Sequence, residues 1–187
     1  MRTILILLTI TIFTFSCQQK SEFQKMKDQE LASGIRNDSL FFGIYLGMPN
    51  QDFFDLCLKM NQKKLFTHGT TSTSVEYVFT GDKLKYPTKM NFYPKFGTDG
   101  KIVEMATEFE YVTWSPWLKD RYAEFLQEEV LNLFNEWYGE GFLKIPHPQF
   151  EFGYTKVDGN RLIVIERKSD RIVKVNYRDL FADGTSS

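Results

Sequence analysis

The sequence predicts an α+β domain in which one antiparallel sheet of about six strands carries two helices on one face. Three observations support this prediction. Two segments have apolar residues at helical spacing, six segments alternate or concentrate apolar residues as strands do, and glycine-containing turns separate the strands. Short turns join antiparallel neighbours, and such a sheet buries one face under helices. The expected order is helix, three strands, helix, three strands.

The chain divides into four predicted regions. Residues 1–16 have the pattern of a secretory signal peptide, and residues 17–39 are polar and predict a tether with no more than a turn or two of helix. Residues 40–181 are expected to form the α+β domain, and they are numerous enough to bury a core of their own. The small and polar residues 182–187 predict a frayed C-terminus.

The first predicted helix starts at Asn50, a favourable N-cap residue that follows Pro49. Four apolar residues then recur at helical spacing and predict a buried stripe: Phe53, Leu56, Cys57 and Met60. We interpret Cys57 as a small core residue, and the alternative is a reactive thiol. A polar segment rich in threonine and serine follows the helix and predicts a loop over residues 67–74.

Three strands are expected next, over 75–79, 89–96 and 101–111. Asp99–Gly100 is a favoured pair for a type I′ hairpin turn, and this turn fixes the register of the last two strands. One face then carries Lys95 with Glu104, Asn91 with Glu108, and Lys89 with Glu110; the other carries Phe96 with Val103, Pro94 with Met105, and Met90 with Phe109. The separation of polar from apolar pairs supports this register, because a slip by one residue would mix the two faces.

The second predicted helix has Ser115 as its N-cap and Pro116 at its first position, and it runs from Trp117 to about Tyr138 before Gly139. Three further strands are expected over Phe150–Lys156, Arg161–Arg167 and Arg171–Tyr177, with a second type I′ turn at Asp158–Gly159. Segments 89–105 and 161–175 resemble each other in sequence, which suggests a tandem αβββ repeat. The alternative is the ordinary regularity of alternating strands.

The N-terminus is the most specific pattern in the chain. Met1–Arg2 precedes an apolar run from Thr3 to Phe15 that is too short to span a bilayer, and Ser16–Cys17 follows. This arrangement resembles the lipobox of bacterial lipoproteins. The resemblance implies cleavage before Cys17, acylation of Cys17 and stable attachment to a membrane. The alternatives are an ordinary cleaved signal peptide or an uncleaved anchor, with Cys17 unmodified in both.

Charge and composition restrict the partners. Removal of residues 1–16 takes away only Arg2 among the charged residues, which leaves 22 basic against 24 acidic residues. This balance argues against a nucleic acid partner, because nucleic acid binding needs a basic patch. Gln18 follows the cysteine where an aspartate would mark retention in the inner membrane of some bacteria. We therefore expect a cell-envelope location, with the outer membrane preferred over the inner membrane.

The standard catalytic and cofactor motifs do not occur in the sequence, so we expect no enzyme activity, no cofactor and no metal site. The two histidines, His68 and His147, are too few for a histidine-rich metal site. His68 lies beside several hydroxyl residues, and a catalytic pair would require one hydroxyl to approach it closely. A solvated loop is the expected alternative for His68, and the same holds for His147 between two prolines.

A cluster of aromatic residues is the best candidate for a partner-binding site. Tyr111, Trp114 and Trp117 lie where a predicted strand gives way to a helix, and Trp and Tyr are enriched at the centres of protein interfaces. The alternative is a hydrophobic staple in which Trp114 packs on the first turns of the following helix. Because the chain is rich in aromatic residues, most of them are expected in the core.

The segment Gly43–Phe53, with Gly-Met before a capped helix, is similar to the start of small envelope lipoproteins of the BamE/SmpA-like kind. It is also similar to the repeats of the β-lactamase-inhibitor-like fold. The resemblance implies a non-catalytic module that binds an unknown protein of the envelope. The alternative hypothesis is a small-ligand-binding or hydrolytic envelope protein with a pocket between sheet and helices.

Overall fold

The computed structural model describes residues 20–69, 71 and 73–182, so residues 1–16 and Cys17 lie outside the described residues. The helices are α1 (Glu22–Ser33), α2 (Asn50–Gln62) and α3 (Ala123–Tyr138), with a short 3₁₀ turn at Lys119–Arg121. The strands are β1 (Thr67–His68), β2 (Val75–Phe79), β3 (Thr88–Phe96), β4 (Ile102–Tyr111), β5 (Leu143–His147), β6 (Glu151–Asp158), β7 (Arg161–Arg167) and β8 (Val173–Asp179).

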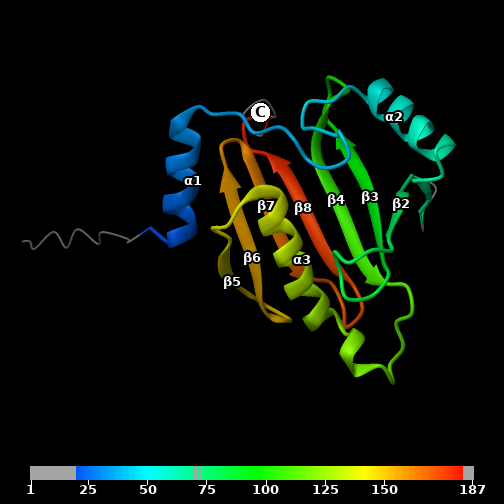
Figure 1. Ribbon diagram of the computed structural model, residues 1–187. Helices are drawn as coiled ribbons and strands as arrows, with labels where there is room; N and C mark the ends of the chain where they lie inside the picture. Colours follow the sequence, from blue (N-terminus) through cyan, green and yellow to red (C-terminus); the bar gives the residue numbers. More distant parts are fainter. Residues whose placement is uncertain (1–19, 70, 72, 183–187) are drawn as a thin grey trace, which may run out of the picture.

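All these strands form one antiparallel sheet in the order β1-β2-β3-β4-β8-β7-β6-β5 (Figure 1). The predicted α+β class and the single antiparallel sheet are therefore confirmed. Each half of the sheet is a helix followed by four consecutive strands, and the last strands of the two halves, β4 and β8, pair at the centre. This arrangement is compatible with two repeated units, and duplication stays a prediction.

The predicted number of six strands is wrong, because the sheet has eight. The two missed strands are the edge strands. β1 has only two residues within the Thr/Ser-rich segment, where no alternation of apolar residues marks a strand. β5 contains Pro146, which suggests a loop in the sequence but is tolerated on an edge strand, where its missing N–H faces no neighbour. Pro146 also limits pairing of the β5 edge with other chains.

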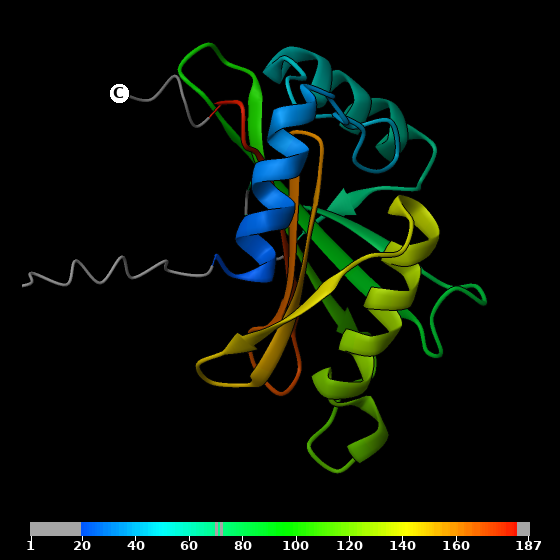
Figure 2. The same ribbon diagram turned by 90° about the vertical axis from the view of Figure 1, so that its left-hand side faces the viewer.

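Three helices surround the sheet where the sequence predicts two. α3 packs over β4, β7 and β8, and α2 lies towards one end of the same side (Figure 2). The ring of Phe53 in α2 meets the ring of Phe96 in β3 at 6.2 Å. The third helix, α1, contacts β6, near the edge of the sheet that is formed by β5 (Figure 1). It occupies the segment that the sequence assigns to a tether.

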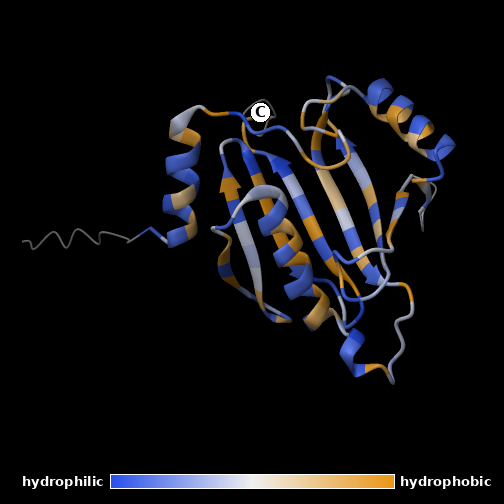
Figure 3. Cartoon of the chain, viewed as in Figure 1, coloured by the Kyte–Doolittle hydropathy of each residue, from blue (hydrophilic) through white to orange (hydrophobic). Residues whose placement is uncertain are grey.

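The core lies between α3 and the sheet. Side chains alternate between buried and partly exposed along β7 and β8. In hydropathy, β7 is apolar without a break from Leu162 to Ile165, whereas the valines of β8 alternate with polar residues (Figure 3). Fully buried side chains from both layers fill the space between them: Leu126, Val130 and Phe134 from α3, and Phe109, Ile165 and Val175 from the sheet. The space between α3 and the sheet is thus filled by packed side chains.

The predicted register of the β3–β4 hairpin is confirmed along most of its length, from Lys95↔Glu104 to Lys89↔Glu110. It is wrong at Phe96, which pairs with Ile102 because a bulge shifts the register there. The turn is not type I′, because only Gly100 has a positive φ, of 74°. The N–H of Gly100 donates to the carbonyl of Gly97, which closes a four-residue turn.

The β6–β7 turn also differs from the prediction. Asp158 pairs with Arg161, so Gly159 and Asn160 are the two turn residues, one position later than predicted. Gly159 has a φ of 58° and Asn160 is not left-handed, which suits a type II′ turn. A Cβ at Gly159 would lie 2.5 Å from the carbonyl oxygen of Ile35, so glycine is required for the close approach of the N-terminal segment.

Tertiary contacts displace both predicted helix starts. Pro49, not Asn50, is the N-cap of α2, and the Asn50 N–H donates to the carbonyl of Gly100 instead. α3 begins at Ala123 rather than Trp117. Tyr122 is extended, and the Ala123 N–H donates to the carbonyl of Asp170 at 2.7 Å. The turn between β7 and β8 therefore sets where α3 begins.

Polar contacts hold the segment after α1 against the second half of the sheet. Asn160 is fully buried, its side-chain NH₂ donates to Asp38 and Asp179 at 2.9 Å each, and its side-chain oxygen accepts from the Asn37 N–H. Arg36 forms an ion pair with Asp179 at 2.8 Å. The predicted tether over 17–39 is therefore wrong from α1 onwards, because distant polar partners that no local pattern reveals bind this segment to the domain.

Arg161 completes this network from β7. Its side chain is 6% exposed and forms an ion pair with Asp158 at 2.6 Å. Its guanidinium also donates to the carbonyl of Ser39 and lies 4.5 Å from the centre of the Tyr138 ring. A buried charge of this kind costs free energy unless it is paired. Removal of Arg161 would likewise leave the Asp158 carboxylate without its counter-charge.

We predict that Arg161→Ala lowers the free energy of unfolding by about 3 kcal/mol, because it leaves the Asp158 carboxylate without its buried partner. Urea denaturation followed by circular dichroism measures the loss. Arg178→Ala is the matched control: this arginine is half-exposed and pairs with Glu104 at 3.5 Å, so its removal should cost less than about 1 kcal/mol. Equal losses in the two variants would contradict a structural role for the network.

Candidate functional site

The predicted aromatic cluster is separated in the structure. Tyr111 is fully buried and its hydroxyl donates to Glu129 of α3 at 2.8 Å. Burial, with the nearby Glu129 carboxylate, raises the pKa of Tyr111 well above its ordinary value. Tyr111 belongs to the core and presents nothing to a partner.

The two tryptophans differ from each other in exposure. The Trp114 ring packs against Tyr122, with ring centres 6.1 Å apart, and the guanidinium of Arg171 lies 5.6 Å from its centre. This placement next to the start of α3 is close to the staple considered as the alternative. Trp117 is 87% exposed. Of the three candidate residues, Trp117 is the one whose ring a partner can reach fully.

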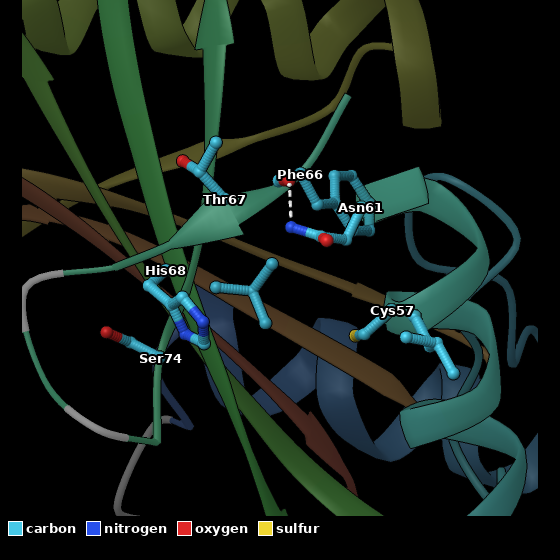
Figure 4. Close-up of a pocket in the computed structure, with 8 residues that line it drawn as sticks. Cys57, Asn61, Phe66, Thr67, His68 and Ser74 are labelled. Atoms are coloured by element: carbon cyan, nitrogen blue, oxygen red, sulfur yellow. Dashed lines mark hydrogen bonds between the residues drawn. The ribbon is translucent and has the colours of Figure 1, made fainter. Parts of the chain in front are cut away.

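A groove between α2 and the β1–β2 hairpin is a stronger candidate for a binding site (Figure 4). Its volume is about 280 Å³, and both secondary-structure elements contribute to its walls. The residues that line it are Cys57, Leu58, Asn61, Phe66, Thr67, His68, Ser74 and Val75. The Asn61 side chain donates to the carbonyl of Phe66 at 2.9 Å and thereby fixes the chain that leaves α2.

Apolar surface continues from this groove along α2. Phe54 is 57% exposed, Leu58 is 59% exposed, and Leu65 just after the helix is 47% exposed. Phe54 and Leu58 are four residues apart on one helix face, and a contiguous exposed apolar surface of this kind is typical of an interaction site. The helical spacing of Phe53, Leu56, Cys57 and Met60 predicts only one apolar stripe on this helix. Phe54 and Leu58, apolar residues outside that stripe, are the feature of the sequence that indicates a second, exposed apolar face.

The groove lies at an edge of the sheet, because β1 is the first strand in the sheet order. An edge strand presents backbone N–H and C=O groups that can pair with an added strand. Lys59, Lys63 and Lys64 are exposed near the same end of α2. The site therefore combines apolar walls, a strand edge and positive charge.

The groove has little capacity for nucleophilic chemistry. Burial raises the pKa of the Cys57 thiol to about 11, so this thiol stays protonated near neutral pH. The Ser74 hydroxyl donates to the carbonyl of Thr71 rather than to His68, although Ser74 and His68 both line the groove.

The second histidine, His147, lies outside the groove. It closes the β5–β6 turn, where its ring nitrogen accepts from the N–H groups of Gln149 and Phe150.

Within residues 20–69, 71 and 73–182 there is no group of three or more His, Cys, Asp or Glu side chains arranged to hold a metal ion. In the same part of the chain, no helix has the length and hydropathy needed to cross a membrane. The chain matches no protein-family model, no curated protein and no solved structure.

We predict slow alkylation of Cys57 in the folded protein. In a Cys17→Ala variant Cys57 is the single cysteine. Because its pKa is raised from 9.0 to about 11, the folded thiol should react with iodoacetamide at pH 8 roughly a hundredfold more slowly than the urea-unfolded chain. The folded rate should keep rising through pH 10. Folded and unfolded rates within about threefold of each other would show that Cys57 is not shielded by α2 and the sheet.

Proposed function

We propose that this chain is a lipid-anchored protein of the bacterial cell envelope that binds a partner protein without catalysis. The N-terminal pattern ending in Cys17 supports the anchor, and Gln18 favours the outer membrane. The single observation that supports binding is the apolar groove between α2 and β1–β2, continued by the exposed Phe54 and Leu58.

The partner that fits this groove is an extended peptide segment with an apolar side chain and acidic neighbours. The strand edge at β1 supplies backbone hydrogen-bonding groups for an extended chain. The apolar walls formed by Cys57, Leu58 and Val75 accept one apolar side chain. The exposed lysines at the C-terminal end of α2 favour acidic residues beside it through electrostatic complementarity.

The position of α1 indicates how the anchored domain would lie relative to the membrane. Residues 18–21 separate Cys17 from α1, and they span at most about 14 Å when fully extended. α1 contacts β6, close to one edge of the sheet, whereas the groove lies at β1, the opposite edge (Figure 1). An anchor at Cys17 would therefore hold the domain near the bilayer and leave the groove on the side away from the attachment point.

We predict that the protein purified from membranes has a mature chain that begins at Cys17 and carries acyl groups. Intact-mass spectrometry measures this directly. A Cys17→Ala variant should lose the acylated form and leave the membrane fraction, because the remaining chain would lack its lipid. A mature chain without lipid in the soluble fraction would contradict the anchor and leave the groove hypothesis untouched.

We predict that a photo-crosslinking amino acid at Leu58 yields one adduct of defined mass in intact cells. The same amino acid at Phe125, which is 49% exposed on α3, is the matched control and should yield no such adduct. A Lys63→Glu, Lys64→Glu double substitution should reduce the Leu58 adduct by about tenfold, because it reverses the charge that attracts the partner. Equal adducts from both positions, or a Leu58 adduct that does not depend on charge, would contradict the proposed site.

A further inference from the structure

A second hollow lies on the face of the sheet opposite to α3. Its volume is about 400 Å³, within the range of small-ligand sites. Tyr93 of β3 and Glu108 of β4 contribute from the sheet, Lys168 from the β7–β8 turn, and Thr71 and Thr73 from the β1–β2 hairpin. Segments far apart in the sequence therefore converge on one polar hollow.

The floor of the hollow is fixed by close packing. Asn91 of β3 is 6% exposed and Ser74 is 5% exposed, and both line the hollow. A Cβ on Gly69 would lie 2.7 Å from the side-chain oxygen of Asn91 and 2.3 Å from the Ser74 hydroxyl oxygen. Glycine at position 69 therefore lets the hairpin lie directly against Asn91.

The charges in the hollow are already balanced. Lys168 donates to the Glu108 carboxylate at 2.7 Å, and Glu108 is the single carboxylate that lines the hollow. This hydrogen bond raises the pKa of Lys168, while burial and the neighbouring Glu108 raise the pKa of Tyr93. Both groups are thus held in their protonated forms, as hydrogen-bond donors beside the Glu108 side chain.

This chemistry selects among ligand classes. A phosphate would need positive charge that is not already paired, and the one ammonium group here is bound to Glu108. A divalent cation would need several carboxylates, and the hollow offers one. An apolar ligand would cover the hydroxyls of Thr71 and Thr73 without offering them hydrogen bonds, which is unfavourable.

A neutral ligand with many hydroxyl groups satisfies all of these conditions. We propose that the hollow formed by Asn91, Tyr93, Glu108 and Lys168 under the β1–β2 hairpin binds a sugar unit. The Glu108 carboxylate, the Lys168 ammonium and the threonine hydroxyls offer donors and acceptors to its hydroxyl groups. The Tyr93 ring supplies an apolar wall for its carbon–hydrogen surface. The site is distinct from the groove at α2, and the inference does not depend on the proposed function.

The test uses the soluble Cys17→Ala chain labelled with ¹⁵N. N-acetyl-D-glucosamine and its β-1,4-linked tetramer are the probes, and inorganic phosphate is the comparison ligand. Titration to about 50 mM should shift the backbone amide signals of Asn91, Tyr93 and Glu108, with a dissociation constant in the millimolar range or below. Tighter binding of the tetramer would indicate a glycan as the source, and equal binding would indicate a free sugar.

Substitutions then locate the site. Tyr93→Ala and Glu108→Ala should each weaken sugar binding at least about tenfold, whereas Tyr93→Phe should change it less than about threefold because the ring remains. Lys95→Ala, an exposed residue on the same face outside the hollow, is the control and should leave binding unchanged. If Tyr93→Ala fails to fold, Glu108→Ala decides the question.

Three results would overturn the inference: no amide shifts with either sugar, shifts that Glu108→Ala leaves intact, or phosphate binding in place of sugar binding. A failure here is distinguishable from a failure at α2, because the crosslink at Leu58 does not involve this hollow.

Discussion

The pairing of β4 with β8 is the constraint on which the rest of the structure depends. These two strands join the halves of the sheet, and six residue pairs run from Glu104↔Arg178 to Phe109↔Val173. The alternate pairs Met105↔Tyr177, Thr107↔Val175 and Phe109↔Val173 are buried on the α3 face, and the Thr107 hydroxyl donates to the Val175 carbonyl at 3.3 Å. Without this pairing each half would be a four-stranded sheet with an exposed central edge. With it, the edges are the short β1 and the proline-containing β5, and α1 and the groove lie on opposite sides of the molecule.

The parts of the fold that could be predicted are those in which local and cross-strand patterns agree. The β3–β4 register follows from alternation, because a one-residue slip would bring Met90 and Phe109 to the solvent face. The turn type could not be inferred in the same way, since the bulge at Phe96 changes the loop length without changing the alternation. The start of α3 and the placement of the segment after α1 depend on Asp170 and Asn160, which are distant in sequence, and no local pattern records such partners.

The candidate sites were harder to predict than the fold for a related reason. Tyr111, Trp114 and Trp117 are neighbours in sequence, yet Tyr111 points into the core at the end of β4 and Trp117 points to solvent after the chain has turned. The groove is the reverse case, because residues from two separate segments, α2 and the hairpin that follows it, lie together in space. Leu58 was visible in the sequence as an apolar residue outside the buried stripe. Val75 begins a predicted strand, but the hairpin that places it beside α2 was not predicted, because the two-residue strand β1 carries no strand pattern.

The β1–β2 hairpin gives two chemically different surfaces to one edge of the sheet. Successive side chains of a strand point to opposite faces, so Val75 faces the apolar groove beside α2 while Glu76 faces the polar side with Asn91. Ser74 lies where these surfaces meet and lines both hollows. An apolar peptide side chain needs an apolar surface, whereas a hydroxylated ligand needs hydrogen-bonding groups. Alternating side chains of the single strand β2 contribute to both kinds of surface. Because Ser74 is the one residue that lines both hollows, substitutions at Leu58 and Tyr93 alter each hollow separately.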